Sequence, residues 1–148
     1  DETMFGPGTL DMGHKRRSIY FMIKRSKLIP FLTVFDAPEP LVSVGGRPAT
    51  TVAPQALIFM NSPYVREYAG NFALQLLSND SATSDIVKAG YWKALSRDPN
   101  DRELQTTIDF VDAQTKSYAA EEQAKPRELA VTDFCQALFS LNEFIFIE

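Results

Sequence analysis

The alternation of apolar and polar positions predicts helices over the second half of the chain. Beyond residue 52, apolar residues recur every three or four positions, which is the spacing of one face of a helix. Five apolar stripes follow one another: Ala56, Leu57 and Met60; Val65, Ala69, Phe72, Ala73, Leu76 and Leu77; Ile86, Val87, Gly90, Tyr91, Ala94 and Leu95; Leu104, Ile108 and Val111; Phe134, Cys135, Leu138 and Phe139. We therefore predict an all-α fold, a compact bundle of about five helices.

Residues that favour helix starts precede several stripes. Thr51 is the expected N-cap of the first helix, with Pro54 in its first turn, where a missing N–H costs nothing. Ser62-Pro63 repeats this arrangement for the second helix. Asn100 followed by Glu103 predicts a capping box, in which each side chain bonds the other residue's backbone N–H.

Other segments predict irregular structure. Polar residues 120–128 indicate a loop, and residues 142–148 (NEFIFIE) are expected to be too short for a helix and to be buried. Residues 15–27 predict either a helix or a short buried strand, because five successive apolar residues do not define a period. Prolines and the Gly45-Gly46 pair exclude long regular elements over the next twenty residues, although Pro30 can open a short helix through Phe35.

Length and composition suit one globular domain. The chain has 148 residues, 45% of them apolar, and no run approaches the ~18 apolar residues that a membrane span requires. It starts with DETMFGPGT, without a Met or a signal segment, so we expect an irregular lead-in from an upstream domain over residues 1–13. Residues 14–148 are expected to form a single helical domain with an irregular, Pro/Gly-rich N-terminal third.

The chain offers few groups for metal or cofactor chemistry. Cys135 and His14 are its only cysteine and histidine, which excludes a disulfide framework and argues against a zinc site. It contains no CxxCH motif for covalent haem attachment. We predict no metal and no cofactor on this part of the chain.

Charge is distributed unevenly around a net value of −4. Residues 15–27 carry six cationic side chains and no acid, namely Lys15, Arg16, Arg17, Lys24, Arg25 and Lys27. Acidic residues dominate beyond Asn100. The basic element has two interpretations: it docks on acidic helices of this domain or on an upstream domain, or it forms an anion-binding face.

Five strings together resemble a known family: RRSIYFMIKRS (Arg16–Ser26), FDAPEP (Phe35–Pro40), the residues from Arg47 through Thr51 and Pro54 to Asn61, ALSRDPNDREL (Ala94–Leu104) and FCQALFSLNEF (Phe134–Phe144). The family is the C-terminal domain of unknown function of planctomycete-type multidomain proteins that often carry cytochrome c-like domains. The resemblance implies an exported bacterial protein, located in the periplasm, cell envelope or extracellular space. It also implies haem on upstream domains and supplies no catalytic residues.

Nine residues are candidate ligand or interdomain contacts: Arg16, Arg17, Tyr20, Lys24, Arg25, Asp36, Arg47, Gln55 and Asn61. An arginine presents a planar fork of donors that matches a carboxylate, sulfate or phosphate. The alternative is structural, with Arg17 buried against Asp36 and the amides of Gln55 and Asn61 tying the Pro-rich segment to a largely buried helix. Asp36 and Glu39 can also be read as a glycosidase pair, and Trp92 as a sugar-stacking platform or, more simply, a packed aromatic.

These observations leave two main hypotheses for function. The first is a structural and interaction module, docked through the basic element and the Pro-rich segment on an upstream domain, with an exposed apolar patch near residues 19–35. The alternative is part of an enzyme or binding site for an anionic or carbohydrate ligand, shared with upstream domains. A third class, an electron-transfer partner, requires a haem protein on the basic face. Nucleic acid is not an expected partner, because the domain is acidic and lacks a recognition motif.

Overall fold

The computed structural model describes residues 6–11, 13–14, 16–24, 26–27, 29–35, 53–78 and 82–145. Over these residues the regular structure is helical: seven α-helices, five of them at least nine residues long, and one short 3-10 helix. The prediction of an all-α fold is confirmed. The chain divides into two compact units, Asp1–Gln55 and Ala56–Glu148. The predicted lead-in over residues 1–13 stays a prediction.

The first unit contains the 3-10 helix η1 (Ser18–Tyr20) and the helix α2 (Pro30–Val34). Pro30 occupies the first turn of α2, as predicted. The longer element expected over residues 15–27 is wrong, both as a helix and as a buried strand. The reason is that the backbone around η1 bonds outside its own segment: Thr9 forms one hydrogen bond with Tyr20 and one with Met22.

Helix α3 (Ala53–Asn61) ends where the sequence predicts, but it buries a different face. Gln55 is 3% exposed, whereas Leu57 and Met60 of the expected stripe are 52% and 61% exposed. Five apolar residues in succession, 56–60, offer two possible inward faces, so the periodicity alone does not select one. The prediction that this helix is largely buried is wrong for the expected face.

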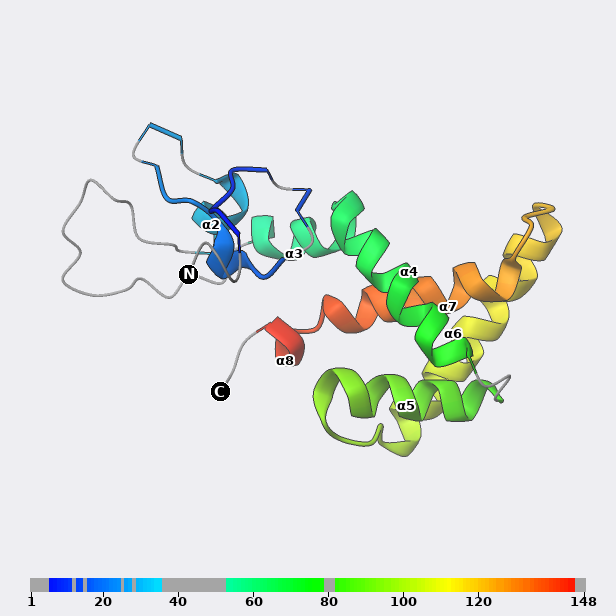
Figure 1. Cartoon of the computed structure of the whole chain (residues 1–148). Helices are drawn as coiled ribbons and strands as arrows, with labels where there is room; N and C mark the ends of the chain where they lie inside the picture. The colour runs from blue at the N-terminus through cyan, green and yellow to red at the C-terminus, as the bar shows by residue number, and fades with distance from the viewer. Residues whose placement is uncertain are drawn as a thin grey trace. The chain divides into compact units, whose positions relative to one another are not determined.

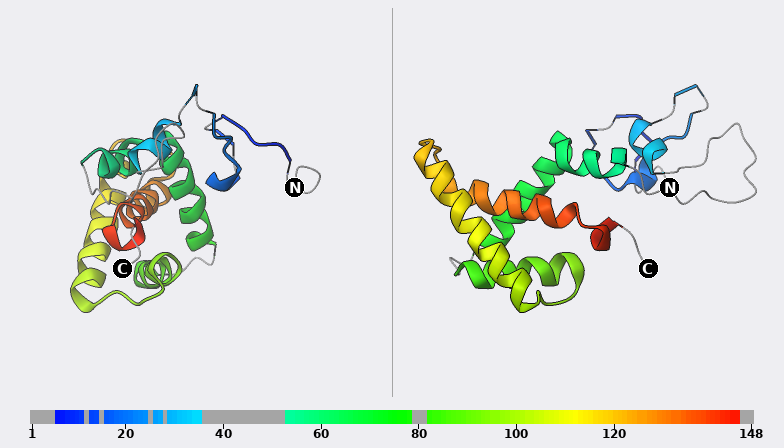
Figure 2. Two further views of the ribbon diagram at one scale, coloured as in Figure 1. Left: turned by 90° about the vertical axis from the view of Figure 1, so that its left-hand side faces the viewer. Right: turned by 180° about the vertical axis from the view of Figure 1, so that it is seen from behind.

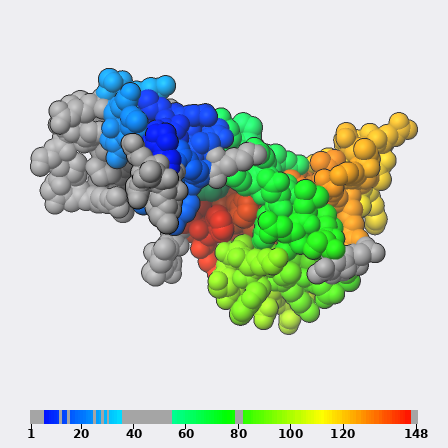
Figure 3. Space-filling model, viewed as in Figure 1, coloured from blue at the N-terminus to red at the C-terminus, as the bar shows by residue number. Residues whose placement is uncertain are grey.

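The second unit is a helical bundle centred on α7 (Figures 1 and 2). Its helices are α4 (Pro63–Leu77), α5 (Thr83–Leu95), α6 (Asp101–Ala120), α7 (Pro126–Phe139) and α8 (Asn142–Ile145). Helix α7 packs most extensively on α4 and α6, while α5 packs on α6 and α7. One surface of this unit is formed by α4 and α5, shown in green in Figure 3.

The core of the second unit consists of the predicted stripes of α4 to α7. Its buried members are Ala69, Ala73, Leu76, Ile86, Val87, Tyr91, Val111, Ala130, Val131, Phe134, Cys135 and Leu138. Leu104, Ile108 and Phe72 pack against this cluster as partly buried residues. Burying a large apolar side chain contributes about 1.5–3 kcal/mol, so this cluster is the main source of stability in the unit.

The predicted helix starts are confirmed at two places. Helix α4 begins at Pro63, although Ser62 makes no capping bond with its side chain. At α6 the capping box forms as predicted, because the Glu103 N–H donates to Asn100 Oδ1 at 2.9 Å and the Asn100 N–H donates to Glu103 Oε2 at 2.8 Å. Both bonds satisfy backbone or side-chain groups that the first helical turn leaves unpaired.

Three local predictions for the second unit are wrong. The loop expected over 120–128 is shorter, because α6 runs to Ala120 and Pro126 opens α7 at a position where proline is favoured. The C-terminal segment forms the short helix α8, and Phe144 is 40% exposed while its ring stacks on Phe139 at 4.9 Å. Trp92, expected to be packed, is 59% exposed on α5.

Within the described residues, no helix combines the length and the apolar character that crossing a bilayer would demand.

Candidate functional site

The strongest candidate for a functional surface is what we call the basic-apolar segment, the described residues between 16 and 27. Its backbone is held by Thr9, whose N–H donates to the Tyr20 carbonyl at 3.1 Å and whose carbonyl accepts from the Met22 N–H at 2.8 Å. The 3-10 turn at Ser18–Tyr20 directly precedes these bonds, and its last residue accepts the first of them. The segment is therefore a fixed loop rather than a helix face.

Apolar side chains on this segment face solvent. Ile19 is 79% exposed, Ile23 is 74% exposed and Met22 is 39% exposed. No residue of η1 is buried. These three side chains agree with the exposed apolar patch that the sequence predicts for this region. Large apolar side chains that lie together on a surface with charged neighbours are typical of interaction sites.

Cationic side chains flank the two isoleucines. Arg17, Lys24 and Lys27 are exposed. None of them forms an ion pair with another described residue. The prediction that Arg17 is buried is wrong, since its side chain is exposed, and its predicted partner Asp36 lies outside the described residues. The segment thus presents positive charge and apolar surface together.

Arg16 has a structural role inside the first unit. Its Nη2 donates to the Pro7 carbonyl at 2.8 Å, and its guanidinium lies over the Tyr20 ring at 5.1 Å from the centroid. The Arg16 backbone N–H donates to His14 Nδ1 at 3.1 Å, and the His14 ring packs edge-on against Phe21 at 4.4 Å. These contacts join the glycine-rich start of the chain to the basic-apolar segment.

The other predicted site residues do not gather at one place in the described part of the chain. Gln55 is buried and its Nε2 donates to the Val34 carbonyl at 2.9 Å, a contact of the kind that the structural interpretation of this residue requires. Asn61 is exposed at the end of α3, so the expectation that it is a buried tie is wrong. The remaining predicted contacts lie outside the described residues: Arg25, Asp36, Glu39 and Arg47.

The described residues provide little for metal or thiol chemistry. They contain no group of three His, Cys, Asp or Glu side chains that could hold a metal ion. Cys135 is fully buried in α7, and burial raises the pKa of its thiol to about 12. The thiolate is the reactive form of cysteine, so this residue is a core side chain rather than a nucleophile.

One polar cluster in the second unit links α4, α6 and α7. Arg66 Nη1 donates to Asp133 Oδ1 at 2.5 Å and to Gln136 Oε1 at 3.1 Å. The Tyr118 hydroxyl donates to Asp133 Oδ2 at 2.8 Å, and this bond raises the pKa of Tyr118. The Gln136 amide in turn donates to two carbonyls at the end of α3. The cluster ties four helices together.

A second cluster is centred on Arg97, after the end of α5. Its Nη1 and Nη2 donate to both carboxylate oxygens of Glu103 at 2.9 Å each. Its Nε and Nη2 donate to the two oxygens of Glu143 at 2.7 and 2.8 Å. These bonds raise the pKa of Arg97 and lower the pKa values of Glu103 and Glu143. One arginine thereby joins the start of α6 to α8.

Sequence reasoning did not identify these two arginines, because their partners are distant in sequence. Arg66 and Asp133 are 67 positions apart, and Arg97 and Glu143 are 46 positions apart. The signal available in the sequence is local and weak: Arg97 follows the predicted end of a helix and precedes a capping glutamate.

Fold and surface together define a small helical protein whose first unit displays a basic, apolar loop and whose second unit is a bundle stabilised by two arginine-centred clusters. The chain belongs to the family PSD1, described as a protein of unknown function (DUF1553), whose sequence profile matches residues 7–111. No curated protein matches the chain. No solved structure matches it.

The family match confirms part of the resemblance seen in the sequence. The chain is a domain of unknown function, and the matched residues include the basic-apolar segment and the capping box of α6. The match ends at Val111, so the string Phe134–Phe144 lies outside it. The planctomycete and cytochrome c associations, the export and the upstream haem stay predictions.

Proposed function

We propose that this chain is an interaction module that docks through its basic-apolar segment on an acidic and partly apolar surface of an upstream domain of the same polypeptide, in an exported multidomain protein. The observation that carries the proposal is the exposure of Ile19 and Ile23, 79% and 74%, between the exposed cations Arg17 and Lys24. A surface of this composition is suited to protein contact.

Energetics support a protein partner more than a small ion. Burying two isoleucine side chains would contribute about 1.5–3 kcal/mol each. A small inorganic anion does not cover these side chains and so cannot provide this stabilisation. The cations would raise the association rate and select an acidic partner, while adding less to affinity. A nucleic acid is a less suitable partner, because its phosphate backbone is negative and the chain as a whole carries a net charge of −4.

The proposal is tested by site-specific photo-cross-linking in the full polypeptide that the gene encodes. A photoreactive phenylalanine analogue replaces Ile23, and the product is mapped by peptide mass spectrometry. We expect cross-links from position 23 to an acidic surface outside these 148 residues. The same analogue at Ala113, which is exposed on α6 of the second unit, is the matched control and should not form them.

Two pairs of substitutions separate the apolar and the electrostatic contributions. Ile19→Ser with Ile23→Ser and, separately, Arg17→Glu with Lys24→Glu should each reduce the cross-linking yield from a neighbouring position such as Met22 at least several-fold. Added salt should reduce it as well, because exposed charges are screened. Cross-links confined to residues 1–148, or a yield that only the charge reversals change, would contradict docking and favour an anionic-ligand site instead.

A further inference from the structure

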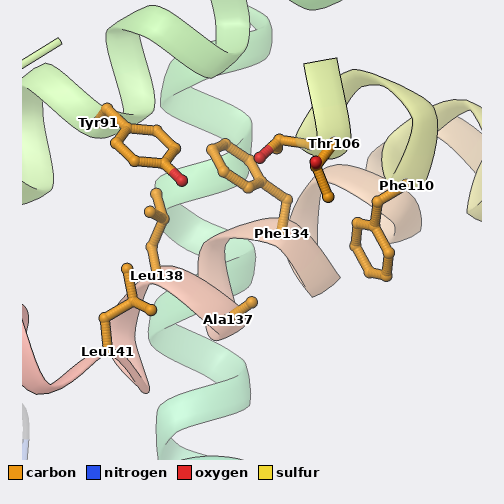
Figure 4. A pocket seen from close by; sticks show the side chains of 8 residues that line it. Tyr91, Thr106, Phe110, Phe134, Ala137, Leu138 and Leu141 are labelled. Atoms are coloured by element: carbon orange, nitrogen blue, oxygen red, sulfur yellow. The ribbon is translucent and has the colours of Figure 1, made fainter. Parts of the chain in front are cut away.

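The second unit contains a pocket that is separate from the basic-apolar segment. It has a volume of about 220 Å³ and lies between α5, α6 and α7. Its walls are formed by eight side chains: Tyr91, Thr106, Thr107, Phe110, Phe134, Ala137, Leu138 and Leu141. In Figure 4, Phe134 lies between Tyr91 on one side and Thr106 and Phe110 on the other.

The lining is apolar with a few neutral hydroxyl groups. Aromatic and aliphatic side chains form most of it, and the polar atoms belong to Tyr91, Thr106 and Thr107. No charged side chain lines the pocket. Arg97 lies over the Tyr91 ring at 5.4 Å, but its guanidinium is bonded to two glutamates. A charged ligand or a sugar would lose its hydration here without adequate partners, so the pocket selects a neutral, largely apolar molecule.

Tyr91 supplies the second observation that points to a ligand. Its side chain is only 6% exposed, and its hydroxyl makes no hydrogen bond with a described residue but stays accessible to solvent. A tyrosine hydroxyl can donate one hydrogen bond and accept another, so it is available to a molecule that enters the pocket. In Figure 4 this hydroxyl points toward the pocket side chains Phe134 and Leu138. A ligand in the pocket can therefore replace water as the partner of this hydroxyl.

The aromatic walls of the pocket are packed against neighbouring side chains. The Tyr91 and Phe134 rings stack at 6.3 Å between centroids, and the Arg97 guanidinium covers the Tyr91 ring. A Cβ atom placed on Gly90 would lie 2.8 Å from the Phe134 ring, so α5 and α7 already approach as closely as they can. These contacts hold the Tyr91 and Phe134 rings beside the empty volume, so the pocket is present without a ligand.

We infer that this pocket binds a small neutral aromatic molecule that carries one hydroxyl group, with the ring packed on Phe134 and Phe110 and the hydroxyl bonded to Tyr91. The inference does not depend on the proposed docking function. Size supports it, because an engineered apolar cavity of ~150 Å³ binds benzene and the present pocket is somewhat larger. The ring fills the apolar volume, and the single oxygen forms a hydrogen bond with the Tyr91 hydroxyl.

The test compares two probes that differ by one hydroxyl, p-cresol and toluene. Each is titrated into the full chain labelled with 15N and with 13C methyl groups, and NMR shift changes are followed. We expect saturable shifts for both probes at Ala137, Leu138 and Leu141. We expect p-cresol to bind about 2- to 10-fold more tightly, the factor that a net hydrogen bond of ~0.5–1.5 kcal/mol gives.

Three variants make the test specific. Tyr91→Phe keeps the ring, so toluene should still bind while the preference for p-cresol disappears. Ala137→Leu should fill the pocket and abolish binding of both probes; Ala137 is exposed, so the variant is expected to fold. Ala113→Leu is the matched control on the exposed face of α6 and should bind as the unaltered chain does. Circular dichroism checks the fold of each variant.

Several results would overturn the inference. These are no saturable shift up to millimolar probe, shifts that map away from the pocket, or a preference for p-cresol that Tyr91→Phe leaves unchanged. Sedimentation velocity at the NMR concentration provides a further criterion. If a second copy of the chain occupies the pocket, the protein sediments as a dimer and Ala137→Leu makes it monomeric, which would also refute a small-molecule site.

Discussion

Helix packing leaves no room for a side chain at Gly90. A Cβ atom there would lie 2.8 and 2.9 Å from two ring carbons of Phe134, itself a buried side chain. We predict that Gly90→Ala destabilises the protein by up to about 2 kcal/mol, because overpacking costs ~1–3 kcal/mol and alanine gains back only ~1 kcal/mol over glycine in a helix. Urea denaturation followed by circular dichroism measures the change.

Gly70 in α4 provides the matched control for this substitution. A Cβ atom at Gly70 would meet only the Thr132 Cγ2 atom, at an ordinary distance of 3.9 Å. Gly70→Ala should therefore be neutral or stabilise the protein by up to ~1 kcal/mol. If Gly90→Ala were as well tolerated as Gly70→Ala, the close approach of α5 and α7 would be refuted.

Cys135 reports on the integrity of the core. Its side chain is fully buried and burial raises its pKa to about 12, so the folded protein presents almost no thiolate at neutral pH. We predict that iodoacetamide labels Cys135 only through opening of α7, with a rate that rises steeply across the denaturation midpoint. Intact-mass spectrometry follows the reaction. Stoichiometric labelling within minutes in native buffer would contradict this placement.

The Arg97 cluster makes the contacts between the end of α5, the start of α6 and α8 sensitive to acid. Arg97 lowers the pKa values of Glu103 and Glu143 below the ordinary value of 4.5. A carboxyl group with a lowered folded-state pKa stabilises the fold above its unfolded-state pKa and loses that contribution as pH falls through the folded-state pKa. The stabilisation should therefore be complete above about pH 5 and should decline progressively below pH 4.5.

Arg97→Gln tests this linkage. The variant should be less stable than the unaltered protein at pH 7 and should lose less of its melting temperature between pH 6 and pH 3, because neither carboxyl group then gains from ionisation. Thermal melts at several pH values, with Arg102→Gln as an exposed control on α6, provide the measurement. Parallel pH curves for the Arg97 variant and the unaltered protein would show that the cluster has no electrostatic role.

At the scale of the secondary-structure elements, the helices that the sequence predicts correctly are those specified by neighbouring residues. Asn100 and Glu103 lie within one helical turn, so their capping box follows from spacing alone. The stripe of α4 is interrupted by polar residues at regular intervals, so its buried face is defined. Continuous apolar runs give no such definition: residues 19–23 do not select between a helix and a strand, and the expected stripe of helix α3 contains the exposed Leu57 and Met60.

The candidate sites were less predictable than the helices, for a physical reason. The composition of the basic-apolar segment is visible in the sequence, but its exposure depends on backbone bonds with Thr9, which no periodicity reveals. The pocket around Tyr91 needs side chains from three helices, and sequence analysis placed Tyr91 only on a core-facing stripe. The position of its hydroxyl in the pocket follows only from the packing of the helices.

At the scale of the whole molecule, the two units differ in how much they bury. Among the described residues, the buried side chains of the first unit are Ile29 and Gln55, whereas the second unit contains a continuous cluster of twelve buried residues. We predict that amides of α4, α6 and α7 show the slowest hydrogen exchange, with protection near the global free energy of unfolding, and that those near η1 exchange much faster.

Hydrogen exchange followed by mass spectrometry measures this difference, and urea separates local from global opening. Sub-denaturing urea should accelerate exchange in α7 strongly and exchange around η1 only slightly. Equal protection in both units would mean that they unfold as one body. Slower exchange near η1 in the full polypeptide than in this chain would be the expected mark of a docked basic-apolar segment.

Trp92 has a practical consequence for anyone who measures this protein. It is the only tryptophan in the chain, and more than half of its side chain already contacts water on the surface of α5. Indole emission will hardly shift when the chain denatures, and a dye-free fluorescence melt will under-report the transition. The same exposure makes Trp92 a useful quenching sensor for anything that settles on the outer side of α5.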